Sequence, residues 1–102
     1  MEKDIEKYLC RKVRDVCGGM SYKFVSPGND GVPDRRVCLP GAVIAFVELK
    51  APGKKPRPLQ LVQIERLRKL GFRVEVIDSF EAVDDLVGSL FAESQRRRRI
   101  GE

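Results

Sequence analysis

Apolar residues recur at helical spacing in three segments of this chain, Asp4–Cys17, Leu59–Leu70 and roughly Phe80–Phe91. The first two segments are each followed by glycine, which commonly ends a helix. The apolar stripes of the first and third segments are formed by Ile5, Leu9, Val13 and Val16, and by Val83, Leu86, Val87 and Leu90. The pattern therefore predicts three amphipathic helices.

Other segments have the composition and alternation of β-strands, and these are Met20–Val25, Arg35–Leu39, Ala42–Leu49 and Phe72–Ile77. The turn Pro40-Gly41 predicts that the second and third strands form a hairpin. The run Ala42–Val47 is apolar and rich in β-branched residues, which is typical of a central buried strand. The predicted element order is α-β-β-β-α-β-α, an α/β fold.

The length of 102 residues suits one domain, which we place at residues 1–92, followed by a basic and flexible tail at 93–102. No apolar run is long enough to span a membrane and no secretory signal is evident, so we expect no membrane association. The sequence has three cysteines without a CxxC pair and no histidine, which argues against zinc. We interpret the cysteines as reduced, as expected for a cytoplasmic protein.

The net charge is +5, and the basic residues are unevenly distributed. Lys54, Lys55 and Arg57 lie in a proline-rich loop, and Arg96–Arg99 form a run near the end. This distribution favours a polyanionic partner such as nucleic acid. A solubilising surface and a solvated tail would account for the charge alone equally well.

Two carboxylates are predicted to meet at the end of the central strand. Glu48 and Lys50 project to the same side because side chains alternate along a strand. Asp34 begins the preceding strand, so the hairpin would bring it close to Glu48. Ionisable groups at the end of a buried strand are costly unless they have partners. A divalent metal ion and an anionic phosphate would serve as such partners.

Two further polar side chains fall inside the apolar arcs of helices. Glu6 points between the directions of Val13 and Cys17, and Gln60 shares one side with Ile64. A core-facing carboxylate or amide requires a partner, so both are candidate site residues. The alternative for Glu6, a carboxylate favoured near a helix N-terminus, is at least as consistent with the helix alone.

These residues resemble the motifs of the PD-(D/E)xK nuclease superfamily. Pro33-Asp34 corresponds to the first half of that motif and Glu48-Leu49-Lys50 to the second. The flanking residues Gly31–Arg35, the Pro/Lys loop and Gln60 are similar to the VRR-NUC family, over roughly Ile5 to Val87. The small stand-alone members found in phages and bacteria are the most similar.

The resemblance implies a restriction-endonuclease-like αβββαβ core with a C-terminal helix, and a Mg²⁺- or Mn²⁺-dependent DNA endonuclease in a bacterial or phage-infected cell. The implied catalytic residues are Glu6, Asp34, Glu48, Lys50 and Gln60. The implied metal ligands are Asp34, Glu48, the Leu49 carbonyl and, as a further candidate, Glu6. We expect the DNA backbone to contact Lys23, Arg35, Lys54, Lys55 and Arg57. The resemblance also implies a homodimer that cuts four-way (Holliday) junctions.

Three alternatives remain open from the sequence. The chain could be a nuclease acting on flaps or other branched DNA, because no base-reading helix is evident. It could be a non-catalytic DNA-binding module, although the acidic set is complete. It could also be a small interaction protein in which Glu48 and Lys50 form an ordinary ion pair, but that interpretation leaves Glu6, Gln60 and the basic loop without a role.

Overall fold

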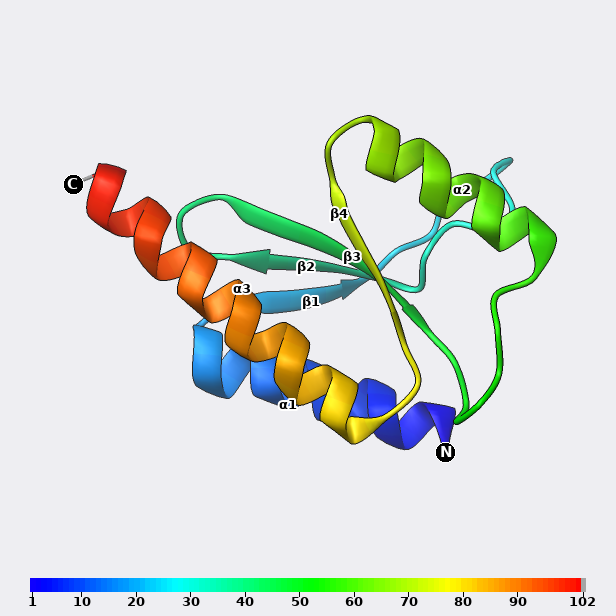
Figure 1. Ribbon diagram of the computed structural model, residues 1–102, viewed down its shortest axis with the longest axis horizontal. Coiled ribbons are helices and arrows are strands. Elements are labelled where there is room, and N and C mark those ends of the chain that lie inside the picture. Colours follow the sequence, from blue (N-terminus) through cyan, green and yellow to red (C-terminus); the bar gives the residue numbers. More distant parts are fainter. Residues whose placement is uncertain (102) are drawn as a thin grey trace.

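The computed structural model describes residues 1–101, which form helices and strands in the predicted order (Figure 1). The helices are α1 (Glu2–Cys17), α2 (Pro58–Lys69) and α3 (Phe80–Gly101). The strands are β1 (Met20–Lys23), β2 (Arg35–Leu39), β3 (Val43–Leu49) and β4 (Arg73–Ile77). The predicted α/β element order is confirmed, and most boundaries lie within two residues of the predicted ones.

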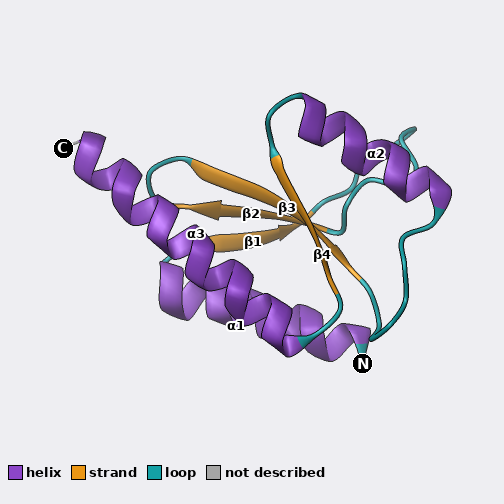
Figure 2. Cartoon of the chain, in the orientation of Figure 1, coloured by secondary structure: helices purple, strands orange, loops and turns teal. Residues whose placement is uncertain are grey.

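The strands form one mixed sheet in the order β1-β2-β3-β4 (Figure 2). Strands β1, β2 and β3 pair antiparallel, whereas β3 and β4 pair parallel. The predicted β2–β3 hairpin turns at Gly41 and Ala42, which have φ angles of 85° and 60°. A parallel pair requires a crossover connection, and α2 provides it. The central strand β3 therefore ends beside the loop that leads into α2.

The helices cover the two faces of the sheet unequally. α1 and α3 lie side by side on one face, and α2 lies on the other (Figure 1). Alternation along β3 sends Val47 and Leu49 toward α1 and α3, and Phe46 toward α2. The larger cluster of buried residues fills the first face, while Phe46, Ile64 and Val74 form the smaller cluster beneath α2. Glu48 has the same parity as Phe46 and so belongs to the α2 face.

The apolar stripe of α1 differs from the predicted one at its last position. Val16 is 42% exposed, and Cys17 is buried in its place. Ile5, Leu9, Val13 and Cys17 follow one another at intervals of four, so they form a single row along the helix. The prediction of Val16 as a core residue was therefore wrong.

Helix α3 runs to Gly101 instead of ending near Phe91. The hydroxyl of the buried Ser94 donates to the Pro40 carbonyl at 2.5 Å, and the guanidinium of Arg97 donates to the Ala42 carbonyl at 3.3 Å. These bonds attach the second half of α3 to the β2–β3 turn. Residues 93–101 therefore continue the helix, and the predicted helix end near Phe91 is wrong; Glu102 lies outside the described residues.

None of the helices in residues 1–101 combines the length and the apolar content needed to cross a lipid bilayer.

Candidate active site

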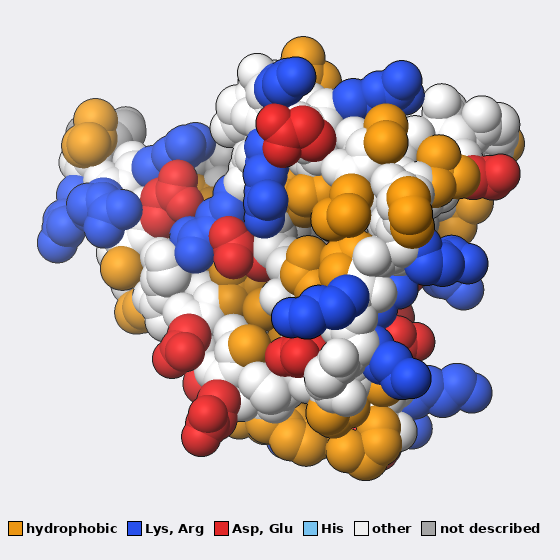
Figure 3. Space-filling view, turned by 45° about the vertical axis from the view of Figure 1, so that its right-hand side comes forward, with side chains coloured by type: hydrophobic (Ala, Val, Ile, Leu, Met, Phe, Trp, Pro, Cys, Tyr) orange, Lys and Arg blue, Asp and Glu red, His pale blue; other side chains and the backbone are white. Residues whose placement is uncertain are grey.

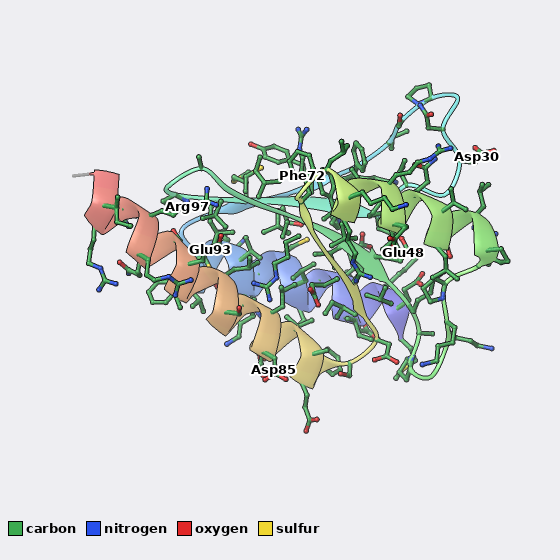
Figure 4. The ribbon with its side chains drawn as sticks, turned by 45° about the horizontal axis from the view of Figure 1, so that its top comes forward. Asp30, Glu48, Phe72, Asp85, Glu93 and Arg97 are labelled. Carbon is green, nitrogen blue, oxygen red and sulfur yellow. The ribbon has the colours of Figure 1, made fainter. Side chains whose placement is uncertain are left out.

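Asp34 lies opposite Glu48 at the open end of the β2–β3 hairpin. Arg35 pairs with Val47, and continuing this antiparallel register by one residue places Asp34 opposite Glu48. Opposite residues of an antiparallel pair project to the same face, so both carboxylates lie on the face that α2 covers. Figure 4 shows Glu48 beneath α2. The predicted proximity of the two carboxylates is confirmed.

Hydrogen bonds to neighbouring strands fix the position of Asp34. Its Oδ2 accepts a hydrogen bond from the Leu49 backbone N–H at 2.8 Å, and its backbone carbonyl accepts one from the Phe24 N–H at 2.8 Å. The Lys50 N–H donates to the Ile77 carbonyl of β4 at 2.9 Å. Because a trans peptide directs its C=O opposite to its N–H, the Leu49 carbonyl points away from β4, toward the side of β3 where Asp34 lies.

Glu48 is a buried carboxylate with an incomplete set of partners. Its side chain is 1% exposed, and neither of its oxygens has a hydrogen-bond partner within the described residues. The Lys50 ammonium, which is 15% exposed, lies 3.2 Å from Oε2 and supplies an ion pair without satisfying the carboxylate. Burial and the negative charge of Asp34 raise the pKa of Glu48 to about 7, although the charge of Lys50 acts in the opposite direction. Buried carboxylates with a strongly raised pKa are concentrated at functional sites.

The donors around Glu48 suit a hard divalent cation. Residues 1–101 contain no group of three or more His, Cys, Asp or Glu side chains close enough to hold a metal ion. The available donors are two carboxylates, Asp34 and Glu48, together with the Leu49 carbonyl. Mg²⁺ is typically bound by one or two carboxylates and completes its shell with water and substrate phosphate oxygens. The buried oxygens of Glu48 that lack hydrogen bonds fit such an ion.

Gln60 lies at the N-terminus of α2 and is 7% exposed. Its amide oxygen accepts a hydrogen bond from the Arg57 backbone N–H at 2.8 Å, which caps the helix and leaves the amide nitrogen available to donate. Gln60, Arg57 and Gly31 line a cleft of about 540 Å³, together with Asp30, Pro58 and Leu59. The loop before β2 closes over this end of α2, because Gln63 Nε2 donates to the Asp30 carbonyl at 3.3 Å.

Glu6 is not brought together with Asp34 and Glu48. Its Oε2 lies 2.9 Å from Nε of Arg35, and both side chains are partly buried. Arg35 has the parity of Val37 and Leu39, which point toward α1, whereas Asp34 points to the α2 face. The predicted core-facing Glu6 is half-buried and paired with an arginine. The helical wheel gave its direction but not the residue that it meets.

Comparisons with known proteins agree with this geometry. No protein-family model matches the sequence. A solved structure described as a VRR_NUC domain superposes with a TM-score of 0.79 and 41% identity, over 85% of this chain and 94% of that chain. The "Putative nuclease p44" of Acyrthosiphon pisum secondary endosymbiont phage 1 is 58% identical over 78 residues, which span 76% of this chain and 83% of the phage protein.

This chain belongs to the VRR-NUC family. The fold expected from the resemblance is thereby confirmed: the VRR-NUC domain has a four-stranded sheet flanked by helices and a C-terminal helix.

The basic residues of this VRR-NUC domain are only partly placed as predicted. Lys23, Lys54, Lys55 and Arg57 are exposed, as nucleic-acid contacts require. Arg35 is 19% exposed and turned toward α1, so it does not lie on the Asp34 face as a DNA contact would. Arg36, which the sequence reasoning missed, is exposed and has the parity of Asp34. Strand alternation was the signal that could have identified it. On the face in Figure 3, basic and acidic side chains are interspersed rather than segregated.

Proposed function

We propose that this VRR-NUC domain is a divalent-metal-dependent DNA endonuclease that hydrolyses phosphodiester bonds at the Asp34–Glu48 pair. The observation that carries the proposal is Glu48, a buried carboxylate that faces a second carboxylate and has the Lys50 ammonium, 3.2 Å from Oε2, as its one cationic partner within the described residues. This arrangement costs folding free energy, which a bound cation would offset. The name of the phage relative, "Putative nuclease p44", and the likeness to a solved VRR-NUC domain support the same activity.

Asp34, Glu48 and the Leu49 carbonyl would hold Mg²⁺ or Mn²⁺. When bound, the cation supplies Lewis-acid polarisation of the scissile phosphate and lowers the pKa of a bound water. Asp34 contributes a carboxylate whose orientation is set by the Leu49 N–H at 2.8 Å. Glu48 contributes a carboxylate that gives up its proton as the pH rises past its pKa of about 7. Cation binding should therefore strengthen with pH across that range.

Lys50 and Gln60 supply the donors at this site. The Lys50 ammonium, 3.2 Å from Glu48 Oε2, can orient the attacking water or offset charge that develops on the phosphate. The amide oxygen of Gln60 is held by the Arg57 N–H, so its amide nitrogen is the group that can donate to water or to phosphate. The exposed Lys54, Lys55 and Arg57 lie in the loop between β3 and α2, where they can contact the DNA backbone.

We further propose that the substrate is a four-way junction and that the protein acts as a homodimer. A symmetric junction needs two symmetric cuts, which two copies related by a two-fold axis can make. At the end of the sheet away from Asp34, Met20, Ile44 and Phe72 remain at least 39% exposed. This apolar area is a surface that a second copy could cover. Flaps and other branched DNA remain the competing substrates.

The test is cleavage of a labelled four-way junction and a matched linear duplex in Mg²⁺, in Mn²⁺ and in EDTA. We expect metal-dependent, paired nicks in the junction, and loss of most turnover in Lys50→Ala with DNA binding nearly unchanged. Lys69→Ala, an exposed lysine at the end of α2, is the matched control and should cut normally. Light scattering after size exclusion should give twice the mass of 11.5 kDa.

Each part of the proposal can fail separately. Equal cutting of junction and duplex would keep the nuclease and remove the junction specificity. A monomer that makes paired nicks would remove the homodimer. Tight DNA binding without cutting in any metal would favour the non-catalytic DNA-binding module.

A further inference from the structure

The residue that follows Asp34, Arg35, forms an ion pair on the opposite face of the sheet. Glu6 of α1 and Arg35 of β2 approach to 2.9 Å between Oε2 and Nε, with exposed fractions of 31% and 19%. The Arg35 Nη1 also donates to the Ser21 carbonyl of β1 at 3.3 Å. Arg35 thus connects helix α1, strand β1 and the first residue of β2. Its partly buried setting makes this pair stronger than an exposed one.

Asp34 needs such a connection because it lies where regular strand pairing ends. The β1–β2 register stops at Lys23 and Arg35, and Asp34 follows directly after the loop formed by residues 24–33. Beyond that register, Asp34 is held by its carbonyl bond to the Phe24 N–H and its carboxylate bond to the Leu49 N–H. A shift of Arg35 would therefore also move Asp34 and its carboxylate.

We propose that Glu6 and Arg35 are positioning residues: their ion pair fixes the start of β2 and thereby orients the Asp34 carboxylate toward the cation and the scissile phosphate. The inference rests on the proposed function. It assigns Glu6 a role through Arg35 rather than as a metal ligand, and it assigns Arg35 a role through Asp34 rather than as a DNA contact. Both assignments differ from those that the sequence motifs suggest.

The test measures Mn²⁺ affinity by isothermal titration calorimetry in the full chain. Glu6→Gln and Arg35→Gln should each weaken Mn²⁺ binding by about tenfold, the lower end of the effect of removing groups that orient metal ligands. The double variant should be no worse than either single variant, because both changes break the same pair. Exchange of the two charges, E6R with R35E, should recover part of the affinity, because it restores the ion pair but not the bond from position 35 to the Ser21 carbonyl. The conservative Glu6→Asp and Arg35→Lys should recover most of the affinity.

A second ion pair provides the matched control. Arg14 and Asp15 on α1 also approach to 2.9 Å, but their side chains are 68% and 55% exposed. Arg14→Gln and Asp15→Asn should leave Mn²⁺ affinity unchanged. The melting temperature of each variant is measured as well, and it distinguishes a variant that has unfolded from one in which Asp34 is only misoriented. If a glutamine variant unfolds, the conservative variants still test the proposal.

Three results would overturn the positioning role. The first is weak Mn²⁺ binding in Glu6→Gln together with wild-type binding in Arg35→Gln, which would make Glu6 a direct ligand. The second is additive losses in the double variant. The third is an Mn²⁺ affinity of Glu6→Gln and Arg35→Gln equal to that of the Arg14 and Asp15 control variants, in a protein whose wild type binds Mn²⁺ and cuts DNA. A wild type that neither binds Mn²⁺ nor cuts DNA would instead refute the proposed function itself.

Discussion

Replacing Glu48 with glutamine should stabilise the metal-free protein at alkaline pH. The change keeps the shape of the side chain and removes a charge that burial and Asp34 both disfavour. The pKa of Glu48 is raised from 4.5 to about 7, and one pKa unit corresponds to about 1.4 kcal/mol. The ionised carboxylate therefore costs about 3 kcal/mol at pH 8. The pKa of about 7 already includes the attraction of Lys50, so we expect glutamine to gain about 3 kcal/mol at pH 8.

The stability gained by Glu48→Gln should increase with pH. The folded protein binds the Glu48 proton more tightly than the unfolded chain, so its stability falls as pH rises from about 4.5 to about 7. The variant lacks this group and should not show that loss. Its advantage should therefore be a few tenths of a kcal/mol near pH 4.5 and should reach its full size at pH 8.

The assay is urea unfolding in EDTA at several pH values, followed by circular dichroism. At pH 8, a gain of about 3 kcal/mol corresponds to a rise in melting temperature of roughly 15 °C for a domain of this size. Glu75→Gln, which removes a carboxylate that is 40% exposed and paired with Arg73, is the matched control and should change stability by less than about 0.5 kcal/mol. A Glu48→Gln protein that is less stable than wild type at pH 8, or whose advantage does not depend on pH, would refute the reasoning.

Three further predictions concern the loop before β2, the exposed surface of β2 and the docking of α3 on the β2–β3 turn. Gly31→Ala should lower stability by about 2 kcal/mol or more in thermal unfolding, because φ is +87° and a Cβ would lie 2.8 Å from the Leu59 carbonyl oxygen. Gly28→Ala should lower stability by less, because Gly28 has a similar φ of +81° but open space around its Cβ position. Equal losses of stability in the two variants would exclude a steric clash as a cause of the Gly31 effect. Arg36→Ala should weaken junction binding about fivefold and reduce its salt dependence, whereas Arg11→Ala on α1 should not; equal binding by the two variants would remove Arg36 from the DNA surface. Ser94→Ala should cost about 1 kcal/mol in urea unfolding, since the Pro40 carbonyl loses its donor; no change would show that α3 docks without this bond.

The sequence predicted those parts of the site that depend on local periodicity. Alternation along β3 and the tight turn at Pro40-Gly41 were sufficient to place Asp34 near Glu48, because a hairpin fixes the register of its strands. The same alternation would have separated Arg35 from Arg36. The burial of Gln60 also followed from helical spacing, although its bond to the Arg57 N–H emerged only from the structure.

The sequence could not predict contacts between distant elements. A helical wheel shows that Glu6 leaves α1 toward the sheet, but the residue that it meets depends on how α1 packs against β2. The length of α3 was missed for a similar reason. Residues 93–101 are polar and basic, and their helix is docked through Ser94 and Arg97 to a turn more than fifty residues earlier in the chain. The catalytic roles of Asp34, Glu48, Lys50 and Gln60 stay predictions.

The most direct test of the central claim is the rate of junction cleavage by Glu48→Gln in saturating Mn²⁺, compared with wild type and Glu75→Gln. If Glu48 holds the cation, the variant should be folded and more stable than wild type in EDTA, yet cut at least about a hundredfold more slowly, while Glu75→Gln cuts normally. Cleavage by Glu48→Gln at the wild-type rate would contradict the assignment of the Asp34–Glu48 pair as the active site.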